Sequence, residues 1–180
     1  MSSEARDAGA GGRIAPTPRP AGEPIKLVGF RIEDWRFAVR LEQVQTAIMP
    51  CAITRVFHVP DYIRGIVSLR GTIVGVLDLG RLLGLEAGTA SYQRLLVVTS
   101  RAVQAAIPVH EVFRVPDVPA DAVAPVPPGV QAPQRLLLEG VINAAAVPGW
   151  QAQEGEATIT LIDVATIFES PGVRSLRGAP

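Results

Sequence analysis

The stretch "GIVSLRGTIVGVLDLGRLLGL", residues 65–85, decides how this chain folds, because it combines two strand-like apolar runs with the start of a helix. The two runs are interrupted by Arg70-Gly71, and glycine accepts the backbone angles that a tight hairpin turn requires. The pattern therefore predicts strands near 63–69 and 73–78 with Arg70 at the turn. Alternation along the first strand places one set of side chains on its outer face: Arg64, Ile66, Ser68 and Arg70.

Two aspartates each follow an apolar strand and precede a short helical pattern. Asp78 stands before "LGRLLG", which Gly84 would end, and Asp163 stands before "VATIFE". An aspartate in this position accepts hydrogen bonds from the first free amides of a helix, which contributes about 1 kcal/mol. Acid–base or metal chemistry is disfavoured, because no third ligand is patterned nearby. We expect both aspartates to cap helices.

The rest of the chain mostly shows a period of two, which is typical of strands with one buried face. The proline-rich segment 115–133 is expected to be a loop, because proline cannot donate to a sheet ladder. In addition to the two strands above, strands are predicted near 25–33, 35–41, 44–50, 93–99, 103–109, 112–115, 135–142 and 157–162.

Three segments of the first half resemble segments of the second half in the same order. "AVRLEQV" (38–44) aligns with "AIPVHEV" (106–112), "GIV" at 65 with "GVI" at 140, and "VLDLGRLL" at 76 with "LIDVATIF" at 161. We interpret this as an internal duplication of a five-stranded unit. Small closed barrels solve the problem of free sheet edges for so few strands. The expected fold class is all-β, with a first barrel at about 25–90 and a second at about 91–169.

The composition of the chain argues against several classes of protein. Seventeen basic residues balance seventeen acidic ones in 180 residues, which argues against a nucleic-acid or anionic-membrane binder. Cys51 is the single cysteine, so no internal disulfide can form, and no apolar run approaches the length of a membrane span. We expect a cytoplasmic protein without membrane insertion. Residues 1–24 are predicted to be a disordered tail and 170–180 a flexible one.

Catalysis is disfavoured, because the reactive residue types are scattered. Cys51, His58 and His110 fit no zinc spacing, and Ser68 lies inside a strand rather than on an exposed elbow. No phosphate-binding glycine motif is present, so no cofactor is expected. A small serine hydrolase using Ser68, His58 and Asp78 remains the least favoured alternative.

The segment "VPDYIRGIVSLRGTIVGVLDLGRLLG" resembles the signature of the CheW-like family of chemotaxis coupling proteins. The Leu-Arg-Gly core followed by Asp-Leu carries the resemblance, which covers about residues 25–169 and includes "FAVRLEQVQTAI" and "TLIDVATIF". The resemblance implies two five-stranded SH3-like barrels that share a core, with short helices after the fifth strands. It also implies a non-catalytic adaptor between the cytoplasmic tip of a chemoreceptor and the regulatory domain of the histidine kinase CheA.

By position, the resemblance assigns partner binding to a small set of residues. Spacing alone favours a solubilising role for the exposed arginine at the turn, whereas the resemblance implies that it binds a partner. The implied binding residues are Arg70, Gly65, Val44, Thr46, Ile66 and Gly71.

The chain departs from the usual family pattern at several positions. Ser68 replaces asparagine, Gly75 proline and Gly80 arginine, while Thr46 and His110 stand where acidic residues are frequent. These departures leave the choice of partner open. A diverged binding module that serves pili, biofilm or second-messenger pathways is the alternative.

Overall fold

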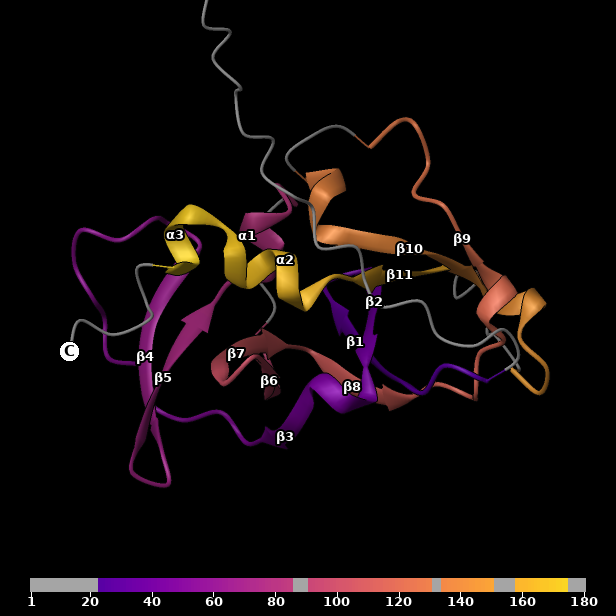
Figure 1. Cartoon of the computed structure of the whole chain (residues 1–180). Coiled ribbons are helices and arrows are strands. Elements are labelled where there is room, and N and C mark those ends of the chain that lie inside the picture. Colours follow the sequence, from indigo (N-terminus) through magenta and orange to yellow (C-terminus); the bar gives the residue numbers. More distant parts are fainter. Residues whose placement is uncertain (1–22, 86–90, 131–133, 151–157, 175–180) are drawn as a thin grey trace, which may run out of the picture.

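The computed structural model describes residues 23–85, 91–130, 134–150 and 158–174, and these form two β-sheets with a few short helices (Figure 1). The all-β prediction is confirmed, and the strand at 63–69 has the predicted bounds. The strands are β1 (Leu27–Ile32), β2 (Trp35–Arg40), β3 (Val44–Ile48), β4 (Ile63–Leu69), β5 (Thr72–Leu77), β6 (Arg94–Ser100), β7 (Val103–Val109), β8 (Glu111–Arg114), β9 (Val123–Ala124), β10 (Leu138–Asn143) and β11 (Thr158–Ile162). The helices are α1 (Leu79–Leu82), α2 (Val164–Glu169) and α3 (Pro171–Arg174), with 3-10 turns at Leu41–Gln43, Ala120–Ala122, Gln134–Leu137 and Ala144–Ala146.

The two sheets repeat the same strand order, which supports the duplication. One sheet runs β8-β1-β2-β11-β10-β9 and the other runs β3-β6-β7-β5-β4. If β1 corresponds to β6, β2 to β7, β3 to β8, β4 to β10 and β5 to β11, the two orders coincide apart from the added β9. Each sheet contains one parallel pair, β11 with β2 and β5 with β7, in which Leu161 pairs with Ala38 and Val76 pairs with Ala106.

The expected boundary near residue 90 does not separate the two sheets. The hairpin β1–β2 from the first half pairs with β8 and β11, while the hairpin β6–β7 from the second half pairs with β3 and β5. Figure 1 shows this as early strands β1 and β2 beside the late strands β10 and β11. Alternation in a sequence shows which face of a strand is buried but not which strand it pairs with, so the exchange of hairpins was not predicted.

The two barrels share a core, as expected. A joint cluster combines Phe30 and Phe37 of one sheet with Leu96 and Ile107 of the other, and Phe168 of α2 covers it. The rings of Phe30 and Phe37 stack with centroids 5.7 Å apart. Each barrel also has a smaller cluster of its own. Burial of apolar side chains in the joint cluster therefore holds both barrels in one unit.

Both predicted helix caps are present. The Asp78 carboxylate accepts a hydrogen bond from the Arg81 backbone N at 3.1 Å, and Gly84 follows the helix with φ +69°. Asp163 accepts from the backbone N of Thr166 at 3.0 Å and from its hydroxyl at 2.7 Å. Each carboxylate satisfies a donor that the helix start leaves free.

Three expectations at loops and ends need correction or lie outside the described residues. The proline-rich segment, expected to be a loop, contains strand β9 and a 3-10 turn. The strand forms at Val123 and Ala124, which are not prolines and can therefore pair with Ile142 and Val141. The expected flexible tail begins with helix α3, whose Val173 is 1% exposed and anchors it to the joint core. Residues 1–22 and 175–180 lie outside the described residues.

Candidate docking surface

The β4–β5 hairpin ends in a two-residue turn made by Arg70 and Gly71. Leu69 pairs with Thr72, and the two turn residues have φ values of 51° and 85°. Two successive positive φ values match the twist of a tight hairpin, in which Asn-Gly is the preferred pair. Arginine at the first position therefore adopts a left-handed conformation that its side chain disfavours by about 1–2 kcal/mol. Fold stability alone does not favour arginine at this tip.

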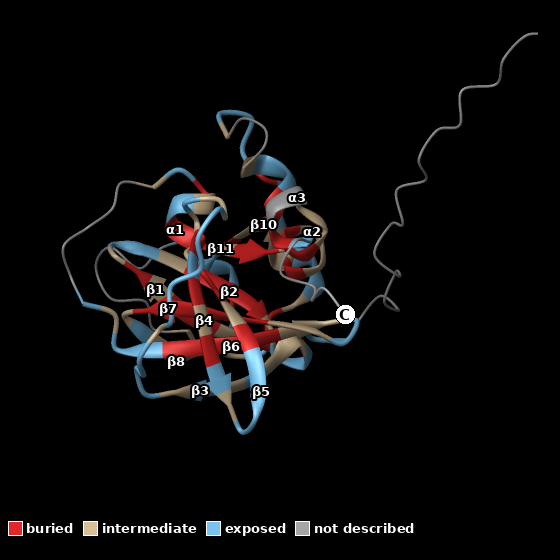
Figure 2. Ribbon diagram, turned by 90° about the vertical axis from the view of Figure 1, so that its left-hand side faces the viewer, coloured by how far each residue is buried: buried red, intermediate tan, exposed pale blue. Residues whose placement is uncertain are grey.

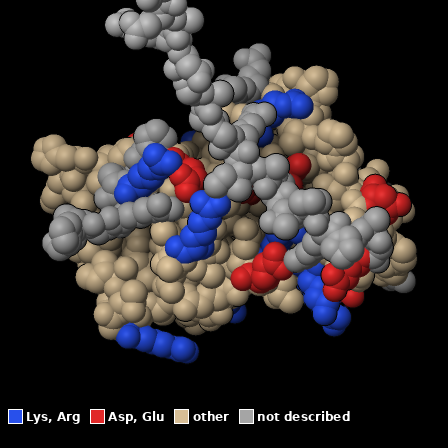
Figure 3. Space-filling model, in the orientation of Figure 1, with Lys and Arg blue, Asp and Glu red and all other residues tan. Residues whose placement is uncertain are grey.

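The outer face of the hairpin is partly apolar and open to solvent. Arg70 and Ser68 are exposed, Ile66 is half-buried, and Ile73 on β5, which pairs with Ser68, is 68% exposed. Figure 2 shows the end of this hairpin as exposed, and the same region of the surface in Figure 3 is mostly uncharged. We call Ile66, Ser68, Arg70, Gly71 and Ile73 the hairpin surface.

Gly65 lies inside the fold and offers no contact surface. It is buried with φ +143°, and a Cβ atom placed there would lie 2.2 Å from the carbonyl oxygen of Thr54. Thr54 forms an isolated bridge with Ile66, so this segment crosses directly over the glycine. Gly65 therefore has a backbone role, since only glycine leaves room for the crossing. An indirect part in partner binding, as the resemblance implies, stays a prediction.

Val44 and Thr46 lie on β3, at the opposite edge of the five-stranded sheet from β4. Both side chains are half-buried, and Val44 packs against the joint core. Among the described residues, no hydrogen bond or ion pair joins Val44 or Thr46 to the hairpin surface. The implied binding residues therefore fall into two groups, one on β3 and one on the hairpin.

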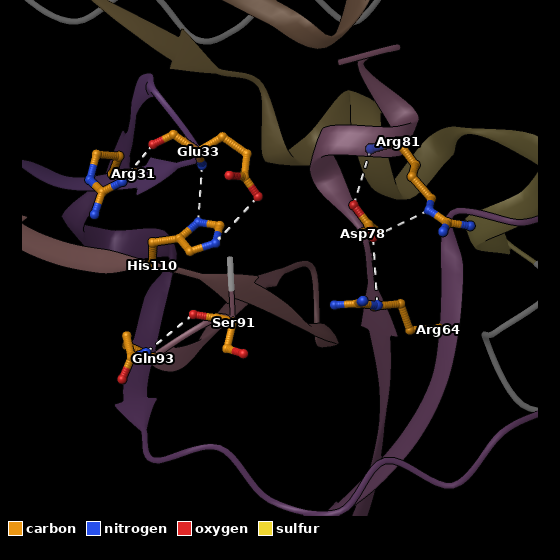
Figure 4. A network of polar contacts seen from close by, with 8 residues as sticks. All are labelled: Arg31, Glu33, Arg64, Asp78, Arg81, Ser91, Gln93 and His110. Atoms are coloured by element: carbon orange, nitrogen blue, oxygen red, sulfur yellow. Dashed lines mark hydrogen bonds and ion pairs between the residues drawn. The ribbon is translucent and has the colours of Figure 1, made fainter. Parts of the chain in front are cut away.

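A polar network surrounds the base of the hairpin (Figure 4). The Asp78 carboxylate, besides capping α1, lies 3.6 Å from Nε of Arg64 and 3.6 Å from Nε of Arg81. The Arg64 guanidinium also lies over the Tyr92 ring, 5.6 Å from its centroid. Asp78 thus orients two arginines that come from β4 and from α1.

His110 packs against the β1–β2 turn, although simple alternation along its segment would place it on the outer face. Its side chain is 9% exposed, its Nδ1 accepts a hydrogen bond from the Glu33 backbone N at 3.0 Å, and its Nε2 lies 3.4 Å from a Glu33 carboxylate oxygen (Figure 4). Glu33 has φ +50° at the β1–β2 turn. The turn needs a partner for its free amide, and this tertiary contact overrides the local alternation. His110 is therefore a structural residue of the turn.

Within the described residues, Ser68, His58 and Asp78 are not brought together as a hydrolase site would require. Ser68 is exposed on β4, His58 is exposed in the β3–β4 segment, and Asp78 is engaged with Arg64 and Arg81. No hydrogen bond joins Ser68, His58 and Asp78 in the part of the chain that the structure describes. Cys51 is exposed.

Sequence reasoning missed several large apolar side chains that are exposed to solvent. Phe57 is 81% exposed and Met49 is 65% exposed, both in the segment between β3 and β4, and Val56 is also exposed. Ile73 could have been found, because the hairpin register places it opposite Ser68. The other three lie in irregular backbone, where no periodicity distinguishes an outward side chain from an inward one.

No helix among the described residues combines the length and apolar character that crossing a membrane requires. Within residues 23–85, 91–130, 134–150 and 158–174, no three His, Cys, Asp or Glu side chains are grouped so that they could hold a metal ion.

Comparison with known proteins agrees with the architecture. A family model described as CheW-like domain matches residues 26–172. The Chemotaxis protein CheW of Rhizobium meliloti is 27% identical over 73 residues, 41% of this chain and 47% of that relative, so the chain spans about half the relative's length. Protein PilI of Pseudomonas aeruginosa is 26% identical over 129 residues, 71% of this chain and 72% of PilI.

The fold also matches a solved structure. The scaffolding protein TtCheW from Thermoanaerobacter tengcongensis superposes with a TM-score of 0.68 and 25% sequence identity, covering 83% of this chain and 95% of that one. That neighbour has two SH3-like β-barrel subdomains, as this chain does. With a family model that spans both barrels, the chain belongs to the CheW-like family.

Proposed function

We propose that this protein is a non-catalytic adaptor that couples a chemoreceptor to the histidine kinase CheA in a chemosensory array. The family to which the chain belongs, and the name of the scaffolding protein that shares its fold, support a role in holding other proteins together. The hairpin surface and β3 are the regions that would contact these partners. The regulatory domain of the kinase and the cytoplasmic tip of the receptor are the two proposed partners.

The conformation of Arg70 is the observation that carries the proposal. Among the described residues, the Arg70 side chain has no hydrogen bond, ion pair or ring contact, although its backbone adopts a disfavoured conformation. A strained, exposed residue that contributes nothing to its own fold is a candidate for binding. Its planar fork of donors can bind a carboxylate or a cluster of carbonyl oxygens on a partner.

The neighbouring residues suit a helical partner. Ile66 and Ile73 form an apolar patch beside Arg70, and interfaces commonly surround such a patch with a polar rim. A helical hairpin would place apolar anchors on Ile66 and Ile73 and an acceptor on Arg70. The half-buried Val44 and Thr46 would contact a partner at the other edge of the sheet.

The test captures purified partners on the immobilised full chain. The partners are the receptor cytoplasmic fragment and the CheA kinase from the same genome, and Arg70→Asn is compared with the unaltered chain. Asparagine fits the turn better than arginine does, so a loss of capture cannot come from a damaged hairpin. We expect at least about tenfold weaker capture of one partner, which equals a loss of about 1.4 kcal/mol.

Arg114→Gln is the matched control, because Arg114 is exposed on β8 of the other sheet. It should leave capture unchanged. If Arg70→Asn captures both partners as well as the unaltered chain does, the assignment of Arg70 is wrong. If the unaltered chain captures neither partner, the coupling function is wrong.

The relatives include proteins that carry names other than CheW, such as Protein PilI, which leaves open a second candidate, a CheW-like binding module in a pathway other than flagellar chemotaxis. Ser68 and Thr46 depart from the residues usual in the family, which is consistent with partners of a different surface chemistry. Capture of the kinase encoded beside a pilus or second-messenger system, in preference to the kinase of a flagellar system, would support this candidate.

A further inference from the structure

A cleft of about 440 Å³ opens at the end of β4 that is far from Arg70. Its walls come from three parts of the chain: the segment before β4, the start of β4 with the adjoining helix α1, and the residues before β6. We call it the arginine cleft, and it is lined by Ile53, Arg55, Val56, Asp61, Ile63, Arg64, Arg81 and Tyr92.

The arginine cleft has one uncompensated positive charge. Arg55, Arg64 and Arg81 line it, while Asp61 lines it and Asp78 lies 3.6 Å from the Nε atoms of Arg64 and Arg81. Within the described residues, Arg55 has no hydrogen bond or ion pair. The three guanidinium groups carry three positive charges and the two carboxylates carry two negative charges, so one further negative charge would neutralise the cleft.

Two of the three arginines, Arg64 and Arg81, are held in place before any ligand arrives. Asp78 holds Arg64 through its Nε, and the Tyr92 ring lies beneath the Arg64 guanidinium. Arg81 donates from a terminal nitrogen to the Asp61 carbonyl oxygen at 3.4 Å. In the described part of the chain, the terminal nitrogens of Arg64 make no hydrogen bond, so they remain available as donors. Preorganised donors lower the cost of binding an acceptor.

The remaining walls are apolar. Ile53, Val56 and Ile63 line the cleft beside the arginines. A ligand that suits the whole cleft therefore combines one anionic group with aliphatic or aromatic groups next to it. A phosphate monoester carries about −1.5 to −2 at neutral pH, which would exceed the free charge and crowd Asp61 and Asp78. A carboxylate carries a single charge and matches the fork geometry of arginine.

We propose that the arginine cleft binds the carboxylate of a glutamate or aspartate side chain that is flanked by apolar residues in a partner protein. This inference rests on the proposed adaptor function and names the chemistry of one partner. The outer face of β4 continues from Arg64 through Ile66 and Ser68 to Arg70, a length of about 20 Å at the rise of a strand. One partner segment lying along this face can place an acidic side chain in the cleft and an acceptor on Arg70.

The direct test titrates the ¹⁵N-labelled full chain with acetyl-Leu-Glu-Leu-amide and records the arginine Nε–H signals by NMR. We expect the signals of Arg55, Arg64 and Arg81 to shift, while the signal of Arg114, on the other sheet, stays in place. The glutamine peptide acetyl-Leu-Gln-Leu-amide is the matched probe without charge. Equal shifts with the glutamine peptide, or larger shifts with inorganic phosphate, would overturn the proposal.

The second test repeats the partner capture with Arg55→Glu. Because Arg55 has no partner among the described residues, the thermal midpoint should not change, while capture should weaken about tenfold. In one outcome, Arg55→Glu leaves both the partner capture and the peptide shifts unchanged, while Arg70→Asn weakens the capture. That result overturns the proposed carboxylate site in the cleft and leaves the adaptor function standing. Peptide shifts confined to the cleft in a chain that captures neither receptor nor kinase support the cleft and reject the adaptor function.

Discussion

Gly65 lies directly beneath the backbone of Thr54, so closely that a Cβ atom would stand 2.2 Å from the Thr54 carbonyl oxygen. The second repeat has the same arrangement, since a Cβ on Gly140 would stand 2.7 Å from the carbonyl oxygen of Ala124. Both glycines follow a register shift in their strand. Each barrel therefore places a short bridging segment across a strand at a glycine.

Gly65→Ala should destabilise the protein by about 3 kcal/mol, because the backbone of Thr54 must move and its two hydrogen bonds with Ile66 must weaken. Gly71→Ala is the matched control. Gly71 has φ +85° but nothing within 4 Å of the Cβ position, so it should lose only about 1–2 kcal/mol. Urea unfolding measures both, and equal losses would show that the close approach at Gly65 is unimportant.

Arg70→Asn should raise the free energy of unfolding by about 1 kcal/mol, because asparagine tolerates the left-handed conformation better. Thr72→Asn serves as the control, since Thr72 is exposed on the same hairpin but has no positive φ. It should give no gain. A loss of stability in Arg70→Asn would mean that the arginine side chain supports the fold.

Asp163→Ala should cost about 1–2 kcal/mol, since the helix α2 loses its cap and the Thr166 hydroxyl loses its acceptor. Asp163→Asn keeps an acceptor oxygen and should cost less. Thr166→Val removes the hydroxyl bond alone and separates the two contributions. Thermal unfolding of the three variants should rank Asp163→Ala as the least stable, and any other order contradicts the capping role.

Val173→Ala should destabilise the protein by about 2 kcal/mol, because it removes buried methyl groups from the joint core. Arg174→Ala is the comparison on the same helix. Arg174 is exposed and pairs with Glu169, so its loss should cost less than about 1 kcal/mol. If both variants unfold at the temperature of the unaltered chain, helix α3 does not contribute to the core.

Local features of the fold were predictable from sequence, because they depend on neighbouring residues. The caps at Asp78 and Asp163 require only a strand, an acceptor and the helix that follows. The Arg70-Gly71 turn requires only two alternating runs with a glycine between them. These elements were predicted at the positions where the structure has them.

Contacts between distant residues could not be predicted in the same way. His110 turns toward Glu33, 77 positions away, because the β1–β2 turn needs an acceptor there. Gly65 is buried because Thr54 crosses it, and the arginine cleft forms where Arg55, Arg64 and Arg81 converge from three segments. Nothing local to any one of these residues indicates its distant neighbour.

The exchange of the hairpins β1–β2 and β6–β7 has a consequence for how the chain folds. Neither half contains a complete barrel, so severing the polypeptide between β5 and β6 should yield two fragments that are unstructured separately and regain the native state only when mixed. Non-local pairing of this kind slows folding, since chain closure must precede the contacts that stabilise it. The two barrels therefore form together, in a single cooperative transition.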